Sequence, residues 1–129
     1  MSDIYEENKY DYEIKGHKIT VDKELSKDQE KRIDNEIHLI ENKWKEIITE
    51  IAKDTYKYGI TTNRRNLYDN AKDILNHLQI KSINYKIINE EKSLFIFCID
   101  LKIPYDDKIP ETKVFVENDI LHIKETKFK

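Results

Sequence analysis

The sequence predicts an α+β fold in which an antiparallel sheet, in the element order β-β-α-α-β-β-β-β, carries two helices on one face. The first observation behind this prediction is a long amphipathic stretch, Ser26 to Gly59. The second is that apolar residues alternate with polar ones on both sides of the helical region, which is typical of half-buried strands. The third is that short turns separate most of these strands, and strands joined by short turns pair as antiparallel neighbours.

The long helix is predicted by its start signal and its apolar period. Ser26 followed three residues later by Gln29 is a capping-box pattern, in which each side chain satisfies an orphan backbone N–H group. Gly59 predicts the end of the helix, because glycine readily adopts the left-handed conformation of a helix C-terminus. One apolar stripe runs along the helix at spacings of three and four, through Ile33, Ile37, Ile40, Trp44, Ile47 and Ile51.

A hairpin is expected before this helix and a shorter helix after it. Tyr10, Tyr12 and Ile14 form the first strand, Ile19 and Val21 the second, and Lys15-Gly16-His17 the turn, with Gly16 free to take a positive φ. Residues 1–8 are expected to be frayed. The shorter helix has Asn66 as its N-cap, with Thr62 or Asn63 as an earlier alternative. Its apolar face consists of Leu67, Ala71, Ile74, Leu75 and Leu78.

Four strands are expected after the shorter helix. They are centred on Ile83 to Ile87, Leu94 to Leu101, Val114 to Val116 and Ile120 to Ile123. The second is almost continuously apolar, which is typical of a central strand that is covered on both faces or deeply buried on one. There is no internal repeat and no low-complexity linker, so residues 1–129 are interpreted as one domain.

Composition narrows the classes of function. With 129 residues the chain is long enough for one packed core. A net charge of −3 gives no reason to expect nucleic acid as a partner, and no apolar run approaches the ~18 residues of a membrane span. The acidic N-terminus lacks a signal-peptide core, and the single cysteine excludes an internal disulfide, so a cytoplasmic location is expected.

No pattern of catalytic or metal-binding residues is recognisable. None of the four histidines has a second histidine or a cysteine at metal-ligand spacing. Cys98 lies within an apolar strand, where cysteine usually acts as a small hydrophobe. The two glycines provide neither a phosphate-binding loop nor a nucleophile elbow. The chain is therefore predicted to be no enzyme, with no cofactor and no resident metal.

The candidate binding residues are aromatic or charged and cluster near the connections between elements. Tyrosine is enriched in protein interfaces, although half-buried tyrosines at the margins of a sheet or helix are equally expected. The arginine pair between the helices can hold a carboxylate or a phosphate. The candidates for a partner-binding surface are Tyr56, Tyr58, Arg64, Arg65, Tyr105, Asp106 and Asp107.

The element order resembles that of a group of small uncharacterised bacterial α+β proteins. The resemblance rests on the strand hairpin, a long helix with Asn42, Trp44 and Ile47 at its centre and Tyr56 and Tyr58 near its end, and final strands containing Val114-Phe115-Val116-Glu117-Asn118-Asp119. It covers the chain from about Tyr10 to Ile123. Several proteins of the group are similar to immunity proteins encoded beside polymorphic toxins. The resemblance implies an inhibitor that binds another protein, and it assigns no role to any single residue.

We therefore predict a non-enzymatic protein-binding domain, in the form of an immunity-like inhibitor of a bacterial toxin. One alternative is a small metal- or ligand-binding protein, or an enzyme, that uses the acidic loop around Asp106 and Asp107, since paired carboxylates bind Mg²⁺ or Ca²⁺. Another is a structural homodimer, because Ile120 to Ile123 is a candidate exposed sheet edge. The expected partner is a protein, and the expected oligomeric state is a monomer or a homodimer.

Overall fold

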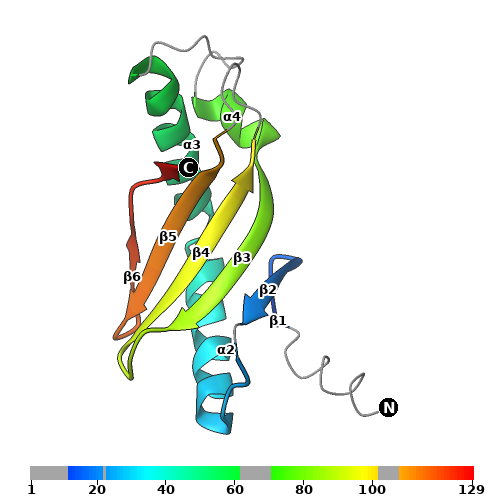
Figure 1. Ribbon diagram of the computed structural model, residues 1–129, viewed down its shortest axis with the longest axis vertical. Coiled ribbons are helices and arrows are strands. Elements are labelled where there is room, and N and C mark those ends of the chain that lie inside the picture. The colour runs from blue at the N-terminus through cyan, green and yellow to red at the C-terminus, as the bar shows by residue number, and fades with distance from the viewer. Residues whose placement is uncertain (1–11, 22, 62–70, 102–107) are drawn as a thin grey trace.

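The computed structural model describes residues 12–21, 23–61, 71–101 and 108–129 as an α+β fold, with three helices packed on a mixed sheet (Figure 1). The helices are α2 (Lys27–Asn42), α3 (Trp44–Thr61) and α4 (Ala71–His77). The strands are β1 (Tyr12–Ile14), β2 (His17–Val21), β3 (Gln79–Ile87), β4 (Lys92–Asp100), β5 (Pro110–Glu117), β6 (Ile120–Ile123) and β7 (Lys127–Phe128). The α+β class predicted from the sequence is confirmed.

The first hairpin forms as predicted from Tyr12 onward, while Tyr10 of the predicted first strand and residues 1–8 lie outside the described residues. Strands β1 and β2 pair antiparallel around a two-residue turn, in which Lys15 has a φ of 50° and Gly16 a φ of 81°. Two successive positive φ values match the right-handed twist of the flanking strands. Gly16 adopts this conformation without strain, whereas Lys15, as an L-residue with a side chain, adopts it at a cost in free energy.

This turn gives a pair of opposite predictions for stability. Gly16→Ala is expected to lower the free energy of unfolding by ~1 kcal/mol, because alanine is strained at this φ. Lys15→Asn is expected to raise it by up to ~1 kcal/mol, because asparagine tolerates the left-handed conformation better than lysine. Chemical denaturation followed by circular dichroism measures both. Equal effects of the same sign would contradict the conformation assigned to the turn.

The helical region begins as predicted but is divided into two helices. The Ser26 hydroxyl accepts a hydrogen bond from the Gln29 backbone, and the Gln29 side chain accepts one from the Ser26 backbone, so the capping box is formed. The helix is interrupted at Lys43, which has a φ of −108° and a ψ of 12°. The apolar stripe continues across this interruption, from Ile40 to Ile47, and both helices therefore face the sheet.

The predicted helix ends need correction. Gly59 does not end the helix, because α3 continues to Thr61. A glycine permits a left-handed stop but does not require one. The shorter helix is present as Ala71–His77, while its proposed N-cap, Asn66, lies outside the described residues. No helix among the described residues is long and apolar enough to cross a membrane.

The predicted fully antiparallel sheet is wrong at one junction. The six strands from β1 to β6 lie in sequence order, and four of the five junctions between them are antiparallel. Strand β2 instead pairs parallel with β3, with Ile19 opposite Ile83. The physical reason is the connection: short turns reverse the chain, whereas the helices between β2 and β3 return it to the same end of the sheet.

The far edge of the sheet contains one more strand than predicted. Strands β5 and β6 form a hairpin whose turn residues, Asn118 and Asp119, have φ values of 51° and 63°. Strand β7 was not predicted from the sequence; it is a two-residue strand that pairs with the first part of β5, beside the stretch that β6 covers. An element this short has no alternating pattern to recognise. Strands β6 and β7 therefore share one edge of β5.

The core lies between the sheet and the helices, and it uses one face of each strand. Phe95 and Phe97 of β4 are fully buried against the helical stripe, together with Ile83 and Tyr85 of β3. The opposite face of the sheet, which we call the open face, is not covered by any helix or strand that the structure describes (Figure 1). The apolar run of β4 thus corresponds to a central strand covered on one face only.

Candidate protein-binding surfaces

Two of the candidate tyrosines lie on α3 and make contacts within the fold. The Tyr58 ring stacks on Phe128 of β7, with ring centroids 3.8 Å apart and an interplanar angle of 15°. Tyr56 is half-buried and packs against the core. Both side chains therefore have a structural role at the junction of α3 with the sheet. A further role in partner binding stays a prediction.

The remaining candidates fall outside the described residues. They are Arg64, Arg65, Tyr105, Asp106 and Asp107. The structure therefore describes only Tyr56 and Tyr58 among the candidates, and these two side chains point to different sides of α3, one to the core and one to Phe128. Elsewhere, the described ranges contain no group of three or more histidine, cysteine, aspartate or glutamate side chains placed to hold a metal ion. The alternative function, a metal- or ligand-binding protein or an enzyme that uses Asp106 and Asp107, stays a prediction.

A groove runs between the helical layer and β6, held at both ends by polar contacts. At one end, the Asn35 side-chain amide of α2 donates to the Asp119 carboxylate in the β5–β6 turn at 3.1 Å. At the other end, the Asp54 carboxylate of α3 accepts a hydrogen bond of 3.0 Å from the Thr126 backbone. These contacts fix the position of β6 relative to α2 and α3. We call the space between them the edge groove.

The edge groove is formed by two adjoining hollows of about 390 and 690 Å³, which share Asn42, Glu46 and Ile123. Its apolar part is formed by Leu39 of α2 and by Leu121 and Ile123 of β6. Its polar part comes from exposed positions on the two helices around Lys43. The full polar lining contributed by the helices is Asn42, Lys43, Lys45, Glu46, Thr49, Glu50 and Lys53.

The backbone of β6 is available along the edge groove. In the described part of the chain, β6 pairs with β5 alone. The residue pair that closes a two-residue hairpin turn is hydrogen-bonded, and Lys124 donates its N–H to the Lys113 carbonyl at 2.9 Å. Hydrogen-bonded pairs alternate along an antiparallel ladder, so the backbone groups of Leu121 and Ile123 point away from β5. An incoming strand can therefore pair with them.

A second surface lies on the open face, where apolar side chains form two neighbouring rows across the sheet. Leu94 is only 6% exposed although no described element covers it, and Ile96 and Phe115 are half-buried. The row through Leu94 reads Lys86, Leu94, Phe115 and His122, and the row through Ile96 reads Thr20, Asn84, Ile96, Lys113 and Lys124. The described residues of these two rows include no carboxylate.

Lysine side chains surround this apolar centre. Lys92 Nζ lies 4.6 Å from the centroid of the Phe115 ring, and Lys124 Nζ lies 6.0 Å from it, within cation–π range. Lysine stems cover apolar surface while keeping the ammonium group in water, which accounts for the low exposure of Leu94. In the sequence, this surface was indicated by the continuous apolar run of β4, in which apolar and polar residues do not alternate. The sequence alone could not show which apolar residues of the run lie on the open face.

A buried polar cluster lies on the other side of the sheet, between α2 and the central strands. The Tyr85 hydroxyl donates to Glu36 Oε1 at 2.5 Å and lies 3.0 Å from the Ser93 hydroxyl. Arg32 Nε lies 3.5 Å from the second oxygen of Glu36. Burial raises the pKa of the Tyr85 hydroxyl above its ordinary value, and the hydrogen bond to Glu36 raises it further. This cluster fixes the docking of α2 on the sheet.

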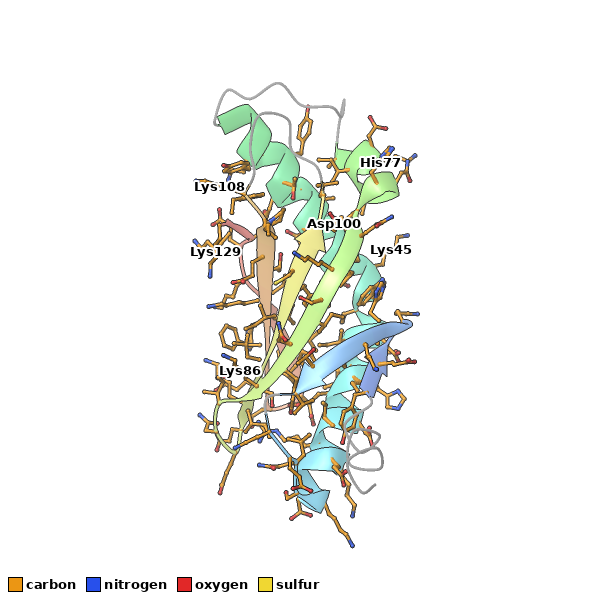
Figure 2. The ribbon with its side chains drawn as sticks, turned by 45° about the vertical axis from the view of Figure 1, so that its right-hand side comes forward. Lys45, His77, Lys86, Asp100, Lys108 and Lys129 are labelled. Carbon is orange, nitrogen blue, oxygen red and sulfur yellow. The ribbon has the colours of Figure 1, made fainter. Side chains whose placement is uncertain are left out.

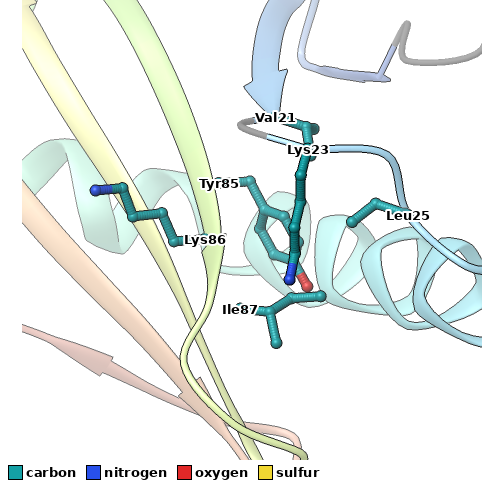
Figure 3. A pocket seen from close by; sticks show the side chains of 6 residues that line it. All are labelled: Val21, Lys23, Leu25, Tyr85, Lys86 and Ile87. Atoms are coloured by element: carbon teal, nitrogen blue, oxygen red, sulfur yellow. The ribbon is translucent and has the colours of Figure 1, made fainter.

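A small cavity of about 150 Å³ opens beside this cluster, lined by Val21, Lys23, Leu25, Tyr85, Lys86 and Ile87. In Figure 3, Tyr85 and Lys86 leave β3 in opposite directions, Tyr85 toward the helical layer and Lys86 toward the open face. The cavity is too small for a drug-sized ligand, since such pockets usually measure ~300 Å³ or more.

The comparisons with known proteins place this chain in no family. No protein-family model matches it, no curated protein matches its sequence, and no solved structure matches its fold. The candidate surfaces therefore rest on the geometry of this chain. Of these, the edge groove and the open face are the two that leave groups available to a partner.

Proposed function

We propose that this chain is a non-enzymatic protein-binding domain that accepts an extended segment of another protein along β6. The observation that carries the proposal is the edge groove, in which the outward backbone groups of Leu121 and Ile123 lie beside an apolar hollow. A strand added to a sheet edge obtains affinity from main-chain hydrogen bonds and specificity from pockets that receive alternate side chains. The edge groove offers both.

An extended segment fits the edge groove better than a second copy of the chain does. An added strand runs about 4.8 Å from its neighbour and directs every second side chain toward the helical layer. Those side chains would enter the hollow above Leu39, Leu121 and Ile123. A second copy that pairs through β6 would bring an equally concave edge, so two hollows would face one another and stay unfilled. The homodimer is therefore the second candidate.

The biological form of this proposal is inhibition of a bacterial toxin, as the resemblance to immunity-like proteins implies. Such an inhibitor needs no catalytic group of its own, because it acts by covering or distorting its target. A toxin segment in extended conformation would occupy the edge groove, and the mixed lysine and glutamate lining would select its charged residues.

The test compares two substitutions at one position. Leu121→Pro removes the outward N–H and blocks strand addition, but it leaves the β5–β6 hydrogen bonds in place. Leu121→Ala loses similar packing and keeps the N–H. We expect the wild type to capture one stoichiometric partner from a lysate of the source organism. Leu121→Ala should capture less of it, because the hollow loses part of its apolar wall, and Leu121→Pro should capture at least about tenfold less than Leu121→Ala. Quantitative mass spectrometry measures the captured amounts.

Two results would contradict the proposal. Equal capture by Leu121→Pro and Leu121→Ala would show that the β6 edge is not used. A sedimentation mass of twice the monomer for the wild type, reduced to the monomer in Leu121→Pro, would assign the edge to the homodimer instead. Circular dichroism of both variants establishes that they are equally folded before binding is compared.

A further inference from the structure

We propose that the open face is a second interaction surface, independent of the edge groove, and that it binds an acidic protein surface with an apolar centre. The surface consists of Leu94, Ile96 and Phe115, ringed by Lys86, Lys92, Lys113 and Lys124. An apolar centre with a polar rim is the usual anatomy of a protein–protein interface. The chemistry of the expected partner follows from the groups that would complement the apolar centre and the lysine rim.

Removal of the apolar centre from water would provide the favourable hydrophobic part of the binding free energy. Leu94 and Phe115 lie opposite one another on β4 and β5, and Ile96 follows two residues after Leu94 on the same face. Their cover consists of long lysine side chains rather than a packed element. Lysine side chains are flexible and their ammonium groups stay in water, so they can move aside to the rim when a partner docks. Apolar area then becomes available at the centre of the contact.

The charge distribution defines the rim of the partner. Lysines occur in both central rows, and no carboxylate occurs among the residues of these rows that the structure describes. Asp100 lies at the opposite end of the sheet from Lys86 (Figure 2). Carboxylates on a partner would therefore meet Lys86, Lys113 and Lys124 in the central rows, while Lys92 lies in the next row, opposite Glu117. Such complementarity raises the association rate and disfavours cationic partners.

The same charges exclude a second copy of the chain as a face-to-face partner, because two sets of lysines would meet. They also distinguish a protein from a nucleic acid. Binding to single-stranded nucleic acid relies on aromatic rings that are free to stack on bases. Phe115 is the one aromatic residue carried by β4 and β5 on the open face, and the Lys92 ammonium already lies 4.6 Å from its ring centroid. The aliphatic neighbours Leu94 and Ile96 favour an apolar protein contact.

The experiment is a titration followed by ¹⁵N–¹H NMR at low and at physiological salt. The probes are a short peptide that combines glutamates with leucines, a polyglutamate peptide of equal length, and a single-stranded oligothymidine. We expect the glutamate–leucine peptide to shift amide resonances of β4 and β5, and to bind about tenfold more tightly than polyglutamate. Raising the salt concentration should weaken its binding, because rim charges are screened.

A matched pair of charge-reversal variants locates the site. Lys86→Glu with Lys113→Glu changes the open face, while Lys31→Glu with Lys57→Glu makes the same change of net charge on the helical layer. The first pair is expected to weaken binding of the glutamate–leucine peptide at least about tenfold, and the second less than about twofold. Denaturation curves establish that both double variants fold.

Several results would overturn the proposal. Equal binding of the two peptides would remove the role of the apolar centre. Tighter binding of oligothymidine would assign the face to nucleic acid. Shifts confined to β6 would place the peptide in the edge groove, and shifts of β4 and β5 that depend on protein concentration without any probe would indicate self-association. The absence of shifts with every probe would show that the face is only a solvated surface.

Discussion

Phe95→Ala is expected to lower the free energy of unfolding by about 3–5 kcal/mol, the largest effect of any single substitution considered for this fold. The Phe95 side chain is fully buried at the centre of the sheet, with Tyr85 and Val114 opposite it on the neighbouring strands. Its ring also contacts that of Tyr85 at a centroid distance of 4.8 Å. Truncation leaves a cavity that the rigid sheet cannot close. Guanidinium chloride denaturation measures the effect.

Phe115→Ala provides the matched control for Phe95→Ala. Phe115 is the same residue type on the adjacent strand, but it lies half-buried on the open face. Its truncation is expected to cost no more than about 2 kcal/mol, because its neighbours are mobile lysine stems and solvent can fill the space. If the two substitutions destabilised the protein equally, the open face would be as well packed as the core, and the assignment of the two faces would be wrong.

Tyr85→Phe is expected to lower the free energy of unfolding by about 1–3 kcal/mol at neutral pH. The substitution keeps the ring but removes the hydroxyl that donates to Glu36 and contacts Ser93. The buried Glu36 carboxylate then loses its shortest hydrogen bond. The free-energy cost of leaving a buried carboxylate without this donor is the main part of the expected loss of stability. Tyr12→Phe is the control, since its hydroxyl lies 3.5 Å from Glu30 at a half-exposed site and should contribute less than about 1 kcal/mol.

The same comparison gives a pH dependence with a defined sign. The pKa of Tyr85 is raised in the folded state, so the unfolded state loses this proton first as the pH rises above about 10. The stability contributed by Tyr85 is therefore fully present below pH 10 and decreases above it, by at most ~1.4 kcal/mol per pH unit. The difference in unfolding free energy between the wild type and Tyr85→Phe should narrow from pH 10 to pH 12. A constant difference would contradict the raised pKa.

Local signals in the sequence were sufficient for most of the secondary structure. The capping box at Ser26 and Gln29, the positive φ at Gly16 and the alternation in β3 and β5 each depend on residues close together in the chain. The parallel β2–β3 junction depends on how the helices return the chain, and no local pattern encodes that. Gly59 shows the limit of a permissive signal, since glycine allows a helix to end but tertiary packing decides whether it does.

The candidate surfaces were less predictable than the fold, because they combine residues from distant elements. The exposed edge at Ile120 to Ile123 was expected from the position of the last predicted strand. The groove beside it required the contacts of Asn35 with Asp119 and of Asp54 with Thr126, which link positions far apart in the chain. Leu94 and Ile96 were recognised as apolar, but only the register of β4 with β5 places them on the open face with Phe115.

The parallel contact between β2 and β3 has a consequence for the order of folding. Four residues connect β3 to β4, nine connect β4 to β5 and two connect β5 to β6. Pairing among these strands therefore closes only short loops and forms quickly. The β1–β2 hairpin contacts the rest of the sheet through Ile19 and its neighbours on β2, across a loop that contains all three helices. We expect this hairpin to dock last during folding and to detach first in partial unfolding. Amide hydrogens that bridge β2 and β3 would then exchange faster than those between β3 and β4.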